Sequence, residues 1–409
     1  MAFVGQNEKA EQQEITPLEL TSWGTLGDTL ATFEDGTINV FGGIPGEQVE
    51  VRILRYRRRR QDHVSGIVTR VLTPSPHRVK APCGYFGACT GCQWQHIAYE
   101  HQLELKRDRV SDNFSKYFQL QAVQISPTLP SPQLLNYRNH ARFTVRNGGQ
   151  MGFINRLSRR FVKIDECMIM DPGINESVSA LQDKVAETTQ LSIRLGVNTG
   201  DLLIQPLMVS SEITVKTGQT HYTESLMGHN MRIASPSFAQ VNTPQTEQMM
   251  KLLRDRLSLT GQELLIDAYA GVGTFAVLLA SSVRRVIAIE ESAAAVKDAA
   301  VNTDGIDNLD FIKGKTEDVL RDLGETPDVV ILDPPRVGCH PDTLQTLISH
   351  PSKRIAYISC DPDTLARDLP ILIDGGYEVE SVQPIDMFPQ THHVECLTVL
   401  RHNREDDRV

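Results

Sequence analysis

The chain has 409 residues and a formal net charge of −10, with 40% hydrophobic and 22% charged residues. This composition excludes disordered and fibrous proteins, and the length predicts two or three domains. No apolar run has the length of a membrane span; even the apolar segment 270–280 is too short. Because the N-terminus is polar and acidic rather than a secretory signal, we expect a cytoplasmic protein with no membrane partner, and a monomer.

Residues 1–14 are predicted to be a disordered tail, and residues 15–73 a small β-barrel. The barrel is indicated by short apolar segments that alternate with glycine-containing turns, such as GGIPGE at 42–47. This region is basic although the whole chain is acidic, and phosphate binding needs only a local basic face. We interpret it as an RNA-binding surface, against the alternative of a solvated charge run; its basic residues are Arg52, Arg55, Arg57, Arg58, Arg59, Arg60, Arg70, Arg78 and Lys80.

Residues 74–242 are predicted to form an α+β central domain. A cysteine-rich stretch comes first, followed by a helix over 98–118 and a proline-rich connector at 126–133. Segments of strand character and one helix then share residues 137–240, which favours an antiparallel sheet.

Residues 243–409 have the pattern of an α/β, Rossmann-like domain. A helix over 243–257 leads into short apolar strands that alternate with helical stretches, which predicts a parallel, doubly wound sheet.

The first strand of this domain leads into a candidate cofactor loop. Leu264–Asp267 is followed by Gly271 and Gly273, which allow a ligand to approach the backbone closely. Glu290 ends the next strand, where a carboxylate can accept hydrogen bonds from ribose hydroxyls. Tyr269 replaces the first glycine of a dinucleotide motif, so a nucleoside-type cofactor is favoured over a nicotinamide. The alternative is a tight turn followed by a surface glutamate.

Three later segments place reactive side chains at strand ends. Asp333 ends one strand before two prolines, and Cys360 ends the next before a helix whose N-terminus would favour a thiolate. Glu395 begins a strand beside His392 and His393 and is a candidate general base. Taken alone, this segment is better interpreted as carrying a buried structural cysteine.

Four cysteines form a candidate metal site. Cys83, Cys89 and Cys92 have the spacing C-x5-C-x2-C, and Cys167 is a candidate fourth ligand. Four thiolates hold either a zinc ion or an iron–sulfur cluster, and spacing alone does not separate the two. The remaining alternative is an accidental spacing without a metal.

Three motifs resemble the uracil-C5 RNA methyltransferase family: SFAQVN (237–242), ISCDPDTLARDL (358–369) and DMFPQTHHVE (386–395). The resemblance extends over nearly the whole chain. It implies a TRAM-type barrel at the N-terminus, an iron–sulfur module at the cysteines and an RNA-binding central domain. It also favours a [4Fe–4S] cluster over zinc on Cys83, Cys89, Cys92 and Cys167.

The resemblance also implies the roles of the site residues. Cys360 would be the nucleophile, Glu395 the base, and Lys315 or a neighbour would lie near the adenine of S-adenosylmethionine. The remaining residues would contact this cofactor or shape its loop: Gln240, Tyr269, Gly271, Gly273, Thr274, Glu290 and Asp333.

The chemistry accounts for these residue types. Addition of a thiolate to carbon 6 of uracil makes carbon 5 nucleophilic, and a base must later remove the carbon 5 proton. The target base must leave its stack, which favours single-stranded RNA. We expect 23S ribosomal RNA as the substrate, with uridine 54 of transfer RNA as the alternative. Arg336 after Pro335 argues against a cytosine target, because some cytosine methyltransferases carry their cysteine there.

Two functions of other classes compete with this prediction. A radical or redox iron–sulfur enzyme that uses S-adenosylmethionine would need an open iron site, which Cys167 as fourth ligand would close. A non-catalytic RNA-binding protein would need neither Cys360 nor Glu395 together with a cofactor loop.

Overall fold

The computed structural model describes residues 14–58 and 61–403, so the predicted tail lies outside the described residues except for Glu14. The chain divides into two compact units. The first comprises the described part of Met1–Gln102 together with Gly152–Ile164 and Gln390–His392, and the second comprises Leu103–Met151, Asp165–Pro389 and the described part of His393–Val409. The domain boundaries predicted after residues 73 and 242 stay predictions.

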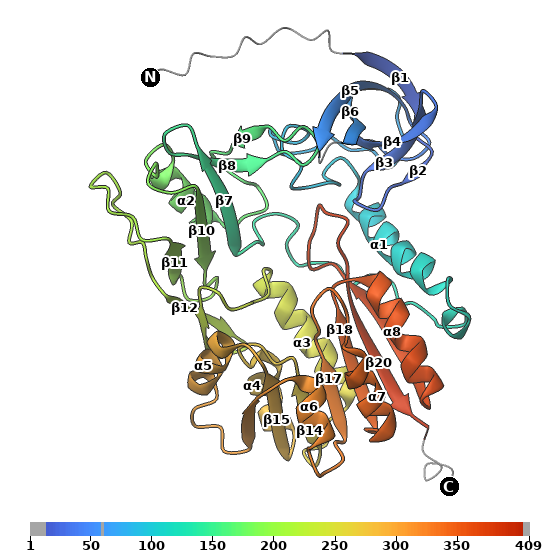
Figure 1. Ribbon diagram of the computed structural model, residues 1–409, viewed down its shortest axis with the longest axis vertical. Coiled ribbons are helices and arrows are strands. Elements are labelled where there is room, and N and C mark those ends of the chain that lie inside the picture. The colour runs from blue at the N-terminus through green and yellow to red at the C-terminus, as the bar shows by residue number, and fades with distance from the viewer. Residues whose placement is uncertain (1–13, 59–60, 404–409) are drawn as a thin grey trace. The chain divides into compact units, whose positions relative to one another are not determined.

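The N-terminal region is a six-stranded sheet, which agrees with the predicted small β-barrel (Figure 1). The sheet has the order β1-β5-β6-β4-β3-β2, with β4 and β6 parallel and the other pairs antiparallel. Alternate residues point inward, as the two-residue period of a strand requires, so Val49, Val51 and Ile53 are buried in one core. The strands are β1 (Ile15–Glu19), β2 (Ser22–Trp23), β3 (Thr29–Phe33), β4 (Gly36–Phe41), β5 (Gln48–Arg58) and β6 (Gln61–Thr73).

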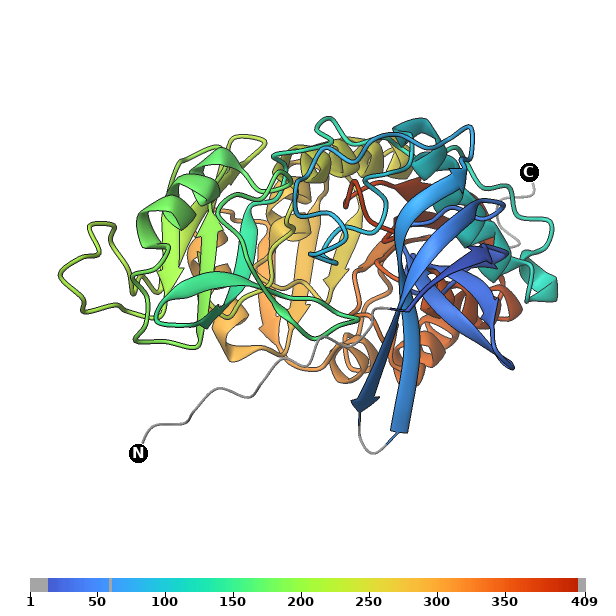
Figure 2. The same ribbon diagram turned by 90° about the horizontal axis from the view of Figure 1, so that it is seen from above.

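The longest strands of this sheet, β5 and β6, form an extended hairpin (Figure 2). Several arginines of the predicted basic surface are paired with acids along these strands and beyond them. Arg55 lies 2.7 Å from Glu34, and Arg78 lies 2.6 Å from the fully buried Glu47. The structure describes no side chain for Arg57–Arg60, so that part of the predicted surface stays a prediction.

The central region contains the antiparallel sheet that the sequence predicts. Its order is β11-β10-β7-β8-β9, and β12 and β13 form a separate antiparallel pair. The predicted helix over 98–118 ends at Phe114, followed by a short 3-10 turn. The elements are α1 (Tyr99–Phe114), η1 (Phe118–Leu120), β7 (His140–Arg146), β8 (Gln150–Ile154), β9 (Phe161–Lys163), α2 (Pro172–Leu181), β10 (Gln190–Leu195), β11 (Leu202–Gln205), β12 (His221–Leu226) and β13 (His229–Ala234).

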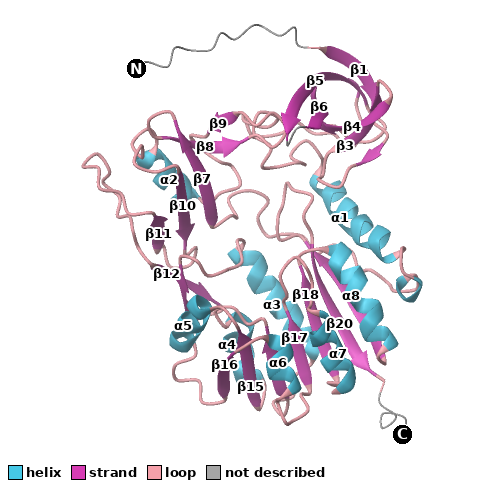
Figure 3. Cartoon of the chain, viewed as in Figure 1, coloured by secondary structure: helices cyan, strands magenta, loops and turns pink. Residues whose placement is uncertain are grey.

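The C-terminal region is a seven-stranded sheet in which strands and helices alternate (Figure 3). The order is β16-β15-β14-β17-β18-β20-β19. Its elements are α3 (Thr243–Leu257), β14 (Leu264–Ala268), α4 (Thr274–Leu279), η2 (Ala280–Ser282), β15 (Arg285–Glu290), α5 (Ala293–Asn302), β16 (Leu309–Lys313), α6 (Thr316–Arg321), β17 (Val329–Leu332), α7 (Pro341–Ser349), β18 (Arg354–Ser359), α8 (Pro362–Asp374), β19 (Tyr377–Ile385) and β20 (Glu395–His402).

The last two strands of the sheet depart from the parallel pattern that the sequence indicates. The pairs from β16 to β18 are parallel, whereas β20 is antiparallel to both β18 and β19. A parallel connection needs a crossover, usually a helix, but only the loop 386–394 joins β19 to β20. The chain therefore turns back on itself and inserts β20 between β18 and β19.

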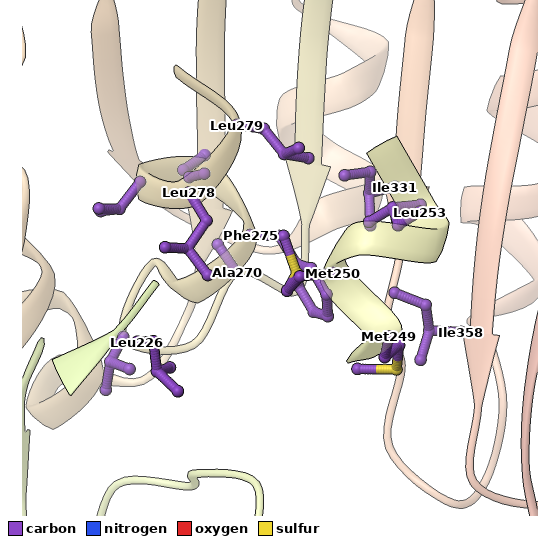
Figure 4. Packing of buried hydrophobic residues seen from close by; sticks show 14 of the residues in the cluster. Leu226, Met249, Met250, Leu253, Ala270, Phe275, Leu278, Leu279, Ile331 and Ile358 are labelled. Carbon is purple, nitrogen blue, oxygen red and sulfur yellow. The ribbon is translucent and has the colours of Figure 1, made fainter. Parts of the chain in front are cut away.

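The sheet is buried on both faces because its strands are apolar at successive positions. In β17, Val329 and Ile331 pack into one core, and Val330 and Leu332 pack into the other. Helices α3 and α4 cover the first face, where Leu253 lies near Ile331 (Figure 4). Helices α1, α6, α7 and α8 contribute to the second core. The described residues contain no helix long and apolar enough to span a membrane.

Candidate active site

The site residues predicted in the second unit lie at the carboxyl ends of the sheet strands. Because β14, β15, β17 and β18 are parallel, the segments that follow them emerge at one edge of the sheet. Tyr269 follows β14, Asp333 follows β17 and Cys360 follows β18, while Glu290 is the last residue of β15. The topology thus brings together residues that are far apart in the sequence.

The cofactor loop has the backbone that the glycines were expected to allow. Gly271 and Gly273 have φ angles of 57° and 86°, and Gly273 directly precedes α4, which begins at Thr274. A Cβ atom added at Gly271 would meet nothing within 4 Å, so the loop leaves space there. Tyr269 also adopts a positive φ, 65°, which the sequence analysis did not predict for a non-glycine residue.

Glu290 is tied to the same loop by its carboxylate. Oε2 accepts a hydrogen bond from the backbone N–H of Gly271 at 2.9 Å, and Oε1 accepts one from Ser292 at 2.7 Å. Gly314, directly after strand β16, donates its N–H to the carbonyl of Glu290. Lys315, the next residue, therefore also follows this strand close to Glu290. A carboxylate fixed in this way keeps further lone pairs for the hydroxyls of a ribose.

Three carboxyl groups are buried close enough to influence one another. Burial raises the pKa of Asp267 to about 8 and that of Asp333 to about 7. Burial and the nearby Asp333 raise the pKa of Glu395 to about 8, and its Oε2 has no hydrogen-bond partner. A site with this many acids favours a ligand that carries positive charge, such as a sulfonium with an ammonium group.

Cys360 and Glu395 lie opposite each other at the end of the β18–β20 ladder. Ser359 pairs with Cys396, so the residues that follow and precede this pair, Cys360 and Glu395, face one another across the two strands. The two side chains also interact electrostatically. A partly buried thiol next to a buried carboxyl is an arrangement that can combine a nucleophile with a base.

The surroundings of Cys360 in the free protein oppose the thiolate that the helix N-terminus was expected to favour. Burial, followed by the neighbouring Glu395, raises the pKa of Cys360 to about 11. The N-terminus of α8 is already capped by the side chain of Asp361, which accepts from the N–H of Asp363 at 3.0 Å. This carboxylate places negative charge where the helix dipole would otherwise stabilise a thiolate.

Arg336 influences the charge state of the site residues, a role that the sequence did not predict. Its charge lowers the pKa of both Cys360 and Glu395, and it contributes to lowering the pKa of His393 to about 4, for which burial is the main cause. His393 is therefore neutral at pH 7. His392, in contrast, belongs to the first unit, where its Nδ1 lies 3.2 Å from Oε1 of Gln93.

The segment around Gln240 is fixed by buried amides. Asn139 donates to the carbonyl of Gln240 at 3.1 Å. Asn242, fully buried, caps α3 and donates to the carbonyl of Met387 at 3.2 Å. Gln240 thus lies two residues before Asn242, which contacts the segment 386–394 that leads to Glu395.

The predicted metal site is not assembled among the described residues. No three Cys, His, Asp or Glu side chains are grouped so that they could hold a metal ion. Cys83, Cys89 and Cys92 belong to the first unit and Cys167 to the second. The thiol of Cys89 interacts with Cys83 and accepts a hydrogen bond from the N–H of Gly91, which is a partial arrangement only.

Known proteins resemble the chain over nearly its whole length. A family model described as tRNA (uracil-5-)-methyltransferase matches residues 201–403. An uncharacterized RNA methyltransferase of Synechocystis is 32% identical over 96% of this chain and 96% of its own length. The chain belongs to the RNA uracil-C5 methyltransferase family. Another relative in this family, an uncharacterized RNA methyltransferase of Listeria innocua, is 31% identical over 97% of this chain and 100% of its own length.

A solved structure shares the fold. The tRNA (uracil-54, C5)-methyltransferase of Pyrococcus abyssi, determined with S-adenosyl-L-homocysteine, matches with a TM-score of 0.74. The match covers 94% of this chain and 99% of the other at 24% identity. Membership of the family makes the protein a methyltransferase of the class that uses S-adenosylmethionine. The predictions of family and fold class are confirmed.

Proposed function

We propose that this family member methylates carbon 5 of a uridine in RNA through a covalent adduct between Cys360 and carbon 6 of the base. The observation that carries the proposal is the position of Cys360 opposite Glu395, with Asp333 interacting electrostatically with both. A nucleophile and a base at one strand end are the two groups that substitution at carbon 5 requires.

Cys360 supplies the nucleophile in the first step. Its sulfur forms a bond to carbon 6, and the electron pair of the 5,6 double bond moves to the uracil carbonyl as an enolate. Arg336 favours the thiolate, because its charge lowers the pKa of Cys360. S-Adenosylmethionine, when bound, supplies the methyl group and a positive charge, and carbon 5 of the enolate takes the methyl group.

Glu395 acts as the base in the last step. The methylated carbon 5 still carries its proton, and the carboxylate of Glu395 removes it. The electron pair of the C–H bond restores the ring double bond, and the bond between carbon 6 and sulfur breaks with release of the thiolate. Burial raises the pKa of Glu395 to about 8, so its carboxylate is a stronger base than that of an exposed glutamate, and the fraction of this base form grows as the pH rises through 8.

The residues of the cofactor loop fit S-adenosylmethionine. We assign the adenosine to Glu290 and the positive-φ loop of Tyr269, Gly271, Gly273 and Thr274, where space and hydrogen-bond acceptors are present. Gln240 and Asp333 complete the proposed contacts. The raised pKa of Asp333 in the free protein is consistent with a carboxyl that binds a cation.

Two RNA classes are candidates for the substrate. The sequence combines a predicted barrel with a cysteine module, and this combination favours 23S ribosomal RNA. The names of the matching family model and of the Pyrococcus abyssi structure favour transfer RNA instead. Because that structure matches nearly all of both chains, domain composition alone does not favour ribosomal RNA.

The cysteine cluster stays a proposal that is supported by sequence spacing. Cys83, Cys89, Cys92 and Cys167 would hold a [4Fe–4S] cluster, with zinc as the alternative, but the described side chains do not form such a site. No step of the mechanism uses it. Anaerobic purification with iron, sulfide and zinc analysis would test it, and a protein without any metal would contradict it.

The reaction is tested with RNA that carries tritium at carbon 5 of uracil. We expect release of tritium to water only when protein and S-adenosylmethionine are both present. Ribosomal and transfer RNA, assayed separately, then identify the substrate class. Incorporation of methyl label without tritium release would show that another atom is methylated and would contradict the mechanism.

The roles of the two residues are tested by substitution. Cys360→Ala should abolish methyl transfer and leave RNA binding unchanged, because the adduct cannot form. Glu395→Gln should slow turnover by about 10²–10⁴-fold and accumulate a covalent RNA–protein complex on a denaturing gel, since proton removal precedes release. If the double variant with both Cys360→Ala and Glu395→Gln still formed the covalent complex, another cysteine would be the nucleophile.

A further inference from the structure

A buried carboxylate on α8 organises the polar contacts behind the candidate site. Asp368 is 1% exposed. Its Oδ2 accepts hydrogen bonds from the hydroxyl of Tyr357 at 2.7 Å and from the backbone N–H of Cys339 at 2.9 Å. Its Oδ1 accepts one from Nε of Arg367 at 2.7 Å. We call Tyr357, Arg367 and Asp368 the polar clamp.

The polar clamp holds the loop that follows Asp333. Arg367 donates through Nη2 to the carbonyl of Val337 at 2.9 Å. Gly338, with a φ of +80°, packs so tightly that an added Cβ would lie 2.6 Å from Oδ2 of Asp368. The loop therefore rests on the clamp and cannot move away without breaking these bonds.

The same loop carries the contact to the cofactor residue Tyr269. The buried thiol of Cys339 interacts with the hydroxyls of both Tyr357 and Tyr269. The hydroxyl of Tyr269 also lies 3.2 Å from Oγ1 of Thr343 and 3.4 Å from the N–H of His340. Tyr269 thus depends for its position on residues that the clamp holds.

We propose that Asp368 is a positioning residue that fixes Tyr269 in the conformation that receives S-adenosylmethionine. The inference rests on the proposed cofactor role of Tyr269. Asp368 also lies on the helix that begins directly behind Cys360, so one carboxylate supports the cofactor loop and the nucleophile segment from the same helix.

The chemistry of the clamp requires a carboxylate. Asp368 receives hydrogen bonds from a hydroxyl, a backbone amide and a guanidinium, and all of these bonds use its oxygens. An asparagine has one oxygen and an NH₂ group, so one nitrogen donor would face another. The mispairing of a buried polar group carries an energetic cost, which the loop can relieve only by shifting.

The test compares Asp368→Asn and Tyr357→Phe with the parent protein, all as full chains. Binding of S-adenosyl-L-homocysteine is measured by calorimetry, and KM and kcat are measured with S-adenosylmethionine and RNA. We expect the dissociation constant and the KM for the cofactor to rise about tenfold, on the order of the loss of one hydrogen bond to a charged group. The KM for RNA should stay within about twofold.

Tyr377→Phe is the matched control. Tyr377 is also a fully buried tyrosine of this sheet, and its hydroxyl accepts from the N–H of Ser352 at 3.0 Å, away from the cofactor loop. It should leave cofactor binding unchanged. The proposal would be overturned if Tyr377→Phe lost as much affinity for S-adenosyl-L-homocysteine as the clamp variants, or if both clamp variants kept the affinity of the parent protein. If Asp368→Asn does not fold, Tyr357→Phe decides the question.

The two proposals can fail separately. Weaker binding of S-adenosyl-L-homocysteine in the clamp variants supports the positioning role even if uracil releases no tritium, in which case only the uridine target falls. Tritium release by the parent protein with unchanged cofactor affinity in the variants would leave the reaction standing and remove the role of Asp368.

Discussion

Single residues set the protonation state of the candidate nucleophile. Burial is the main cause that raises the pKa of Cys360; Glu395 raises it further and Arg336 lowers it. The thiol is protonated at neutral pH in the free protein, and the fraction of thiolate grows as the pH rises towards about 11. Reactivity at this position therefore depends on the charges that surround it at each stage of the reaction.

Two substitutions should shift the reactivity of Cys360 in opposite directions. Glu395→Gln removes a negative charge and should lower the pKa of the thiol, whereas Arg336→Gln removes a positive charge and should raise it. The rate of alkylation by iodoacetamide, followed at Cys360 by mass spectrometry between pH 7 and 11, measures both shifts. Shifts in the same direction would mean that a change of packing, rather than charge, governs the thiol.

At the scale of elements, α1 is joined to the segment after β19 by a buried ion pair. Lys106 and Asp386 are both fully buried and hydrogen bonded to each other, and Lys106 also donates to the carbonyl of Phe388 at 3.1 Å. This segment leads to Glu395, so a helix from the central part of the sequence supports the strand that carries the candidate base.

Removal of one partner of this pair should be costly. Lys106→Met removes the buried ammonium group from the carboxylate of Asp386 and should lower the free energy of unfolding by about 3–5 kcal/mol. The matched control is Lys116→Met, which breaks a pair whose side chains are both 59% exposed and should cost less than about 1 kcal/mol. Urea unfolding measures both, and equal losses would show that the buried pair has no special role.

The sequence predicted the elements better than their arrangement. The two-residue and 3.6-residue periods indicated the strands and helices, and the motifs placed Cys360, Asp333 and Glu290 correctly at strand ends. Periodicity does not reveal which strands are neighbours, so the antiparallel β20 was not predicted. The roles of Arg336 and Lys106 depend on charges brought together by folding, which local sequence does not contain.

At the scale of the whole molecule, an acidic chain is proposed to bind a polyanion. The net charge is −10, and the described arginines Arg55, Arg70 and Arg78 are paired with acids. Paired arginines have already lost part of the attraction that they would offer to phosphates. We therefore assign the proposed RNA contacts of the barrel to Arg57–Arg60, whose side chains lie outside the described part of the chain.

Replacement of Arg57–Arg60 by glutamine in the full chain should weaken RNA binding and reduce its dependence on salt. Each lost phosphate contact lowers the slope of log affinity against log salt by about 0.7 for single-stranded RNA. The double variant Arg55→Gln and Arg70→Gln serves as control and should change the slope little. Titrations at several salt concentrations provide the measurement, and an unchanged slope in the first variant would place the phosphate contacts elsewhere.

The insertion of β20 between β18 and β19 has a consequence for synthesis on the ribosome. Strand β19 is made before β20, yet it pairs with no other strand of the sheet among the described residues. A growing chain can therefore form the cofactor loop while β19 is paired, in the described part of the chain, only by two isolated bridges to residues 125–129. Only translation of residues 395–402 completes the ladder and brings Glu395 into place, so the residue proposed to attack the base is made before the residue proposed to release the product.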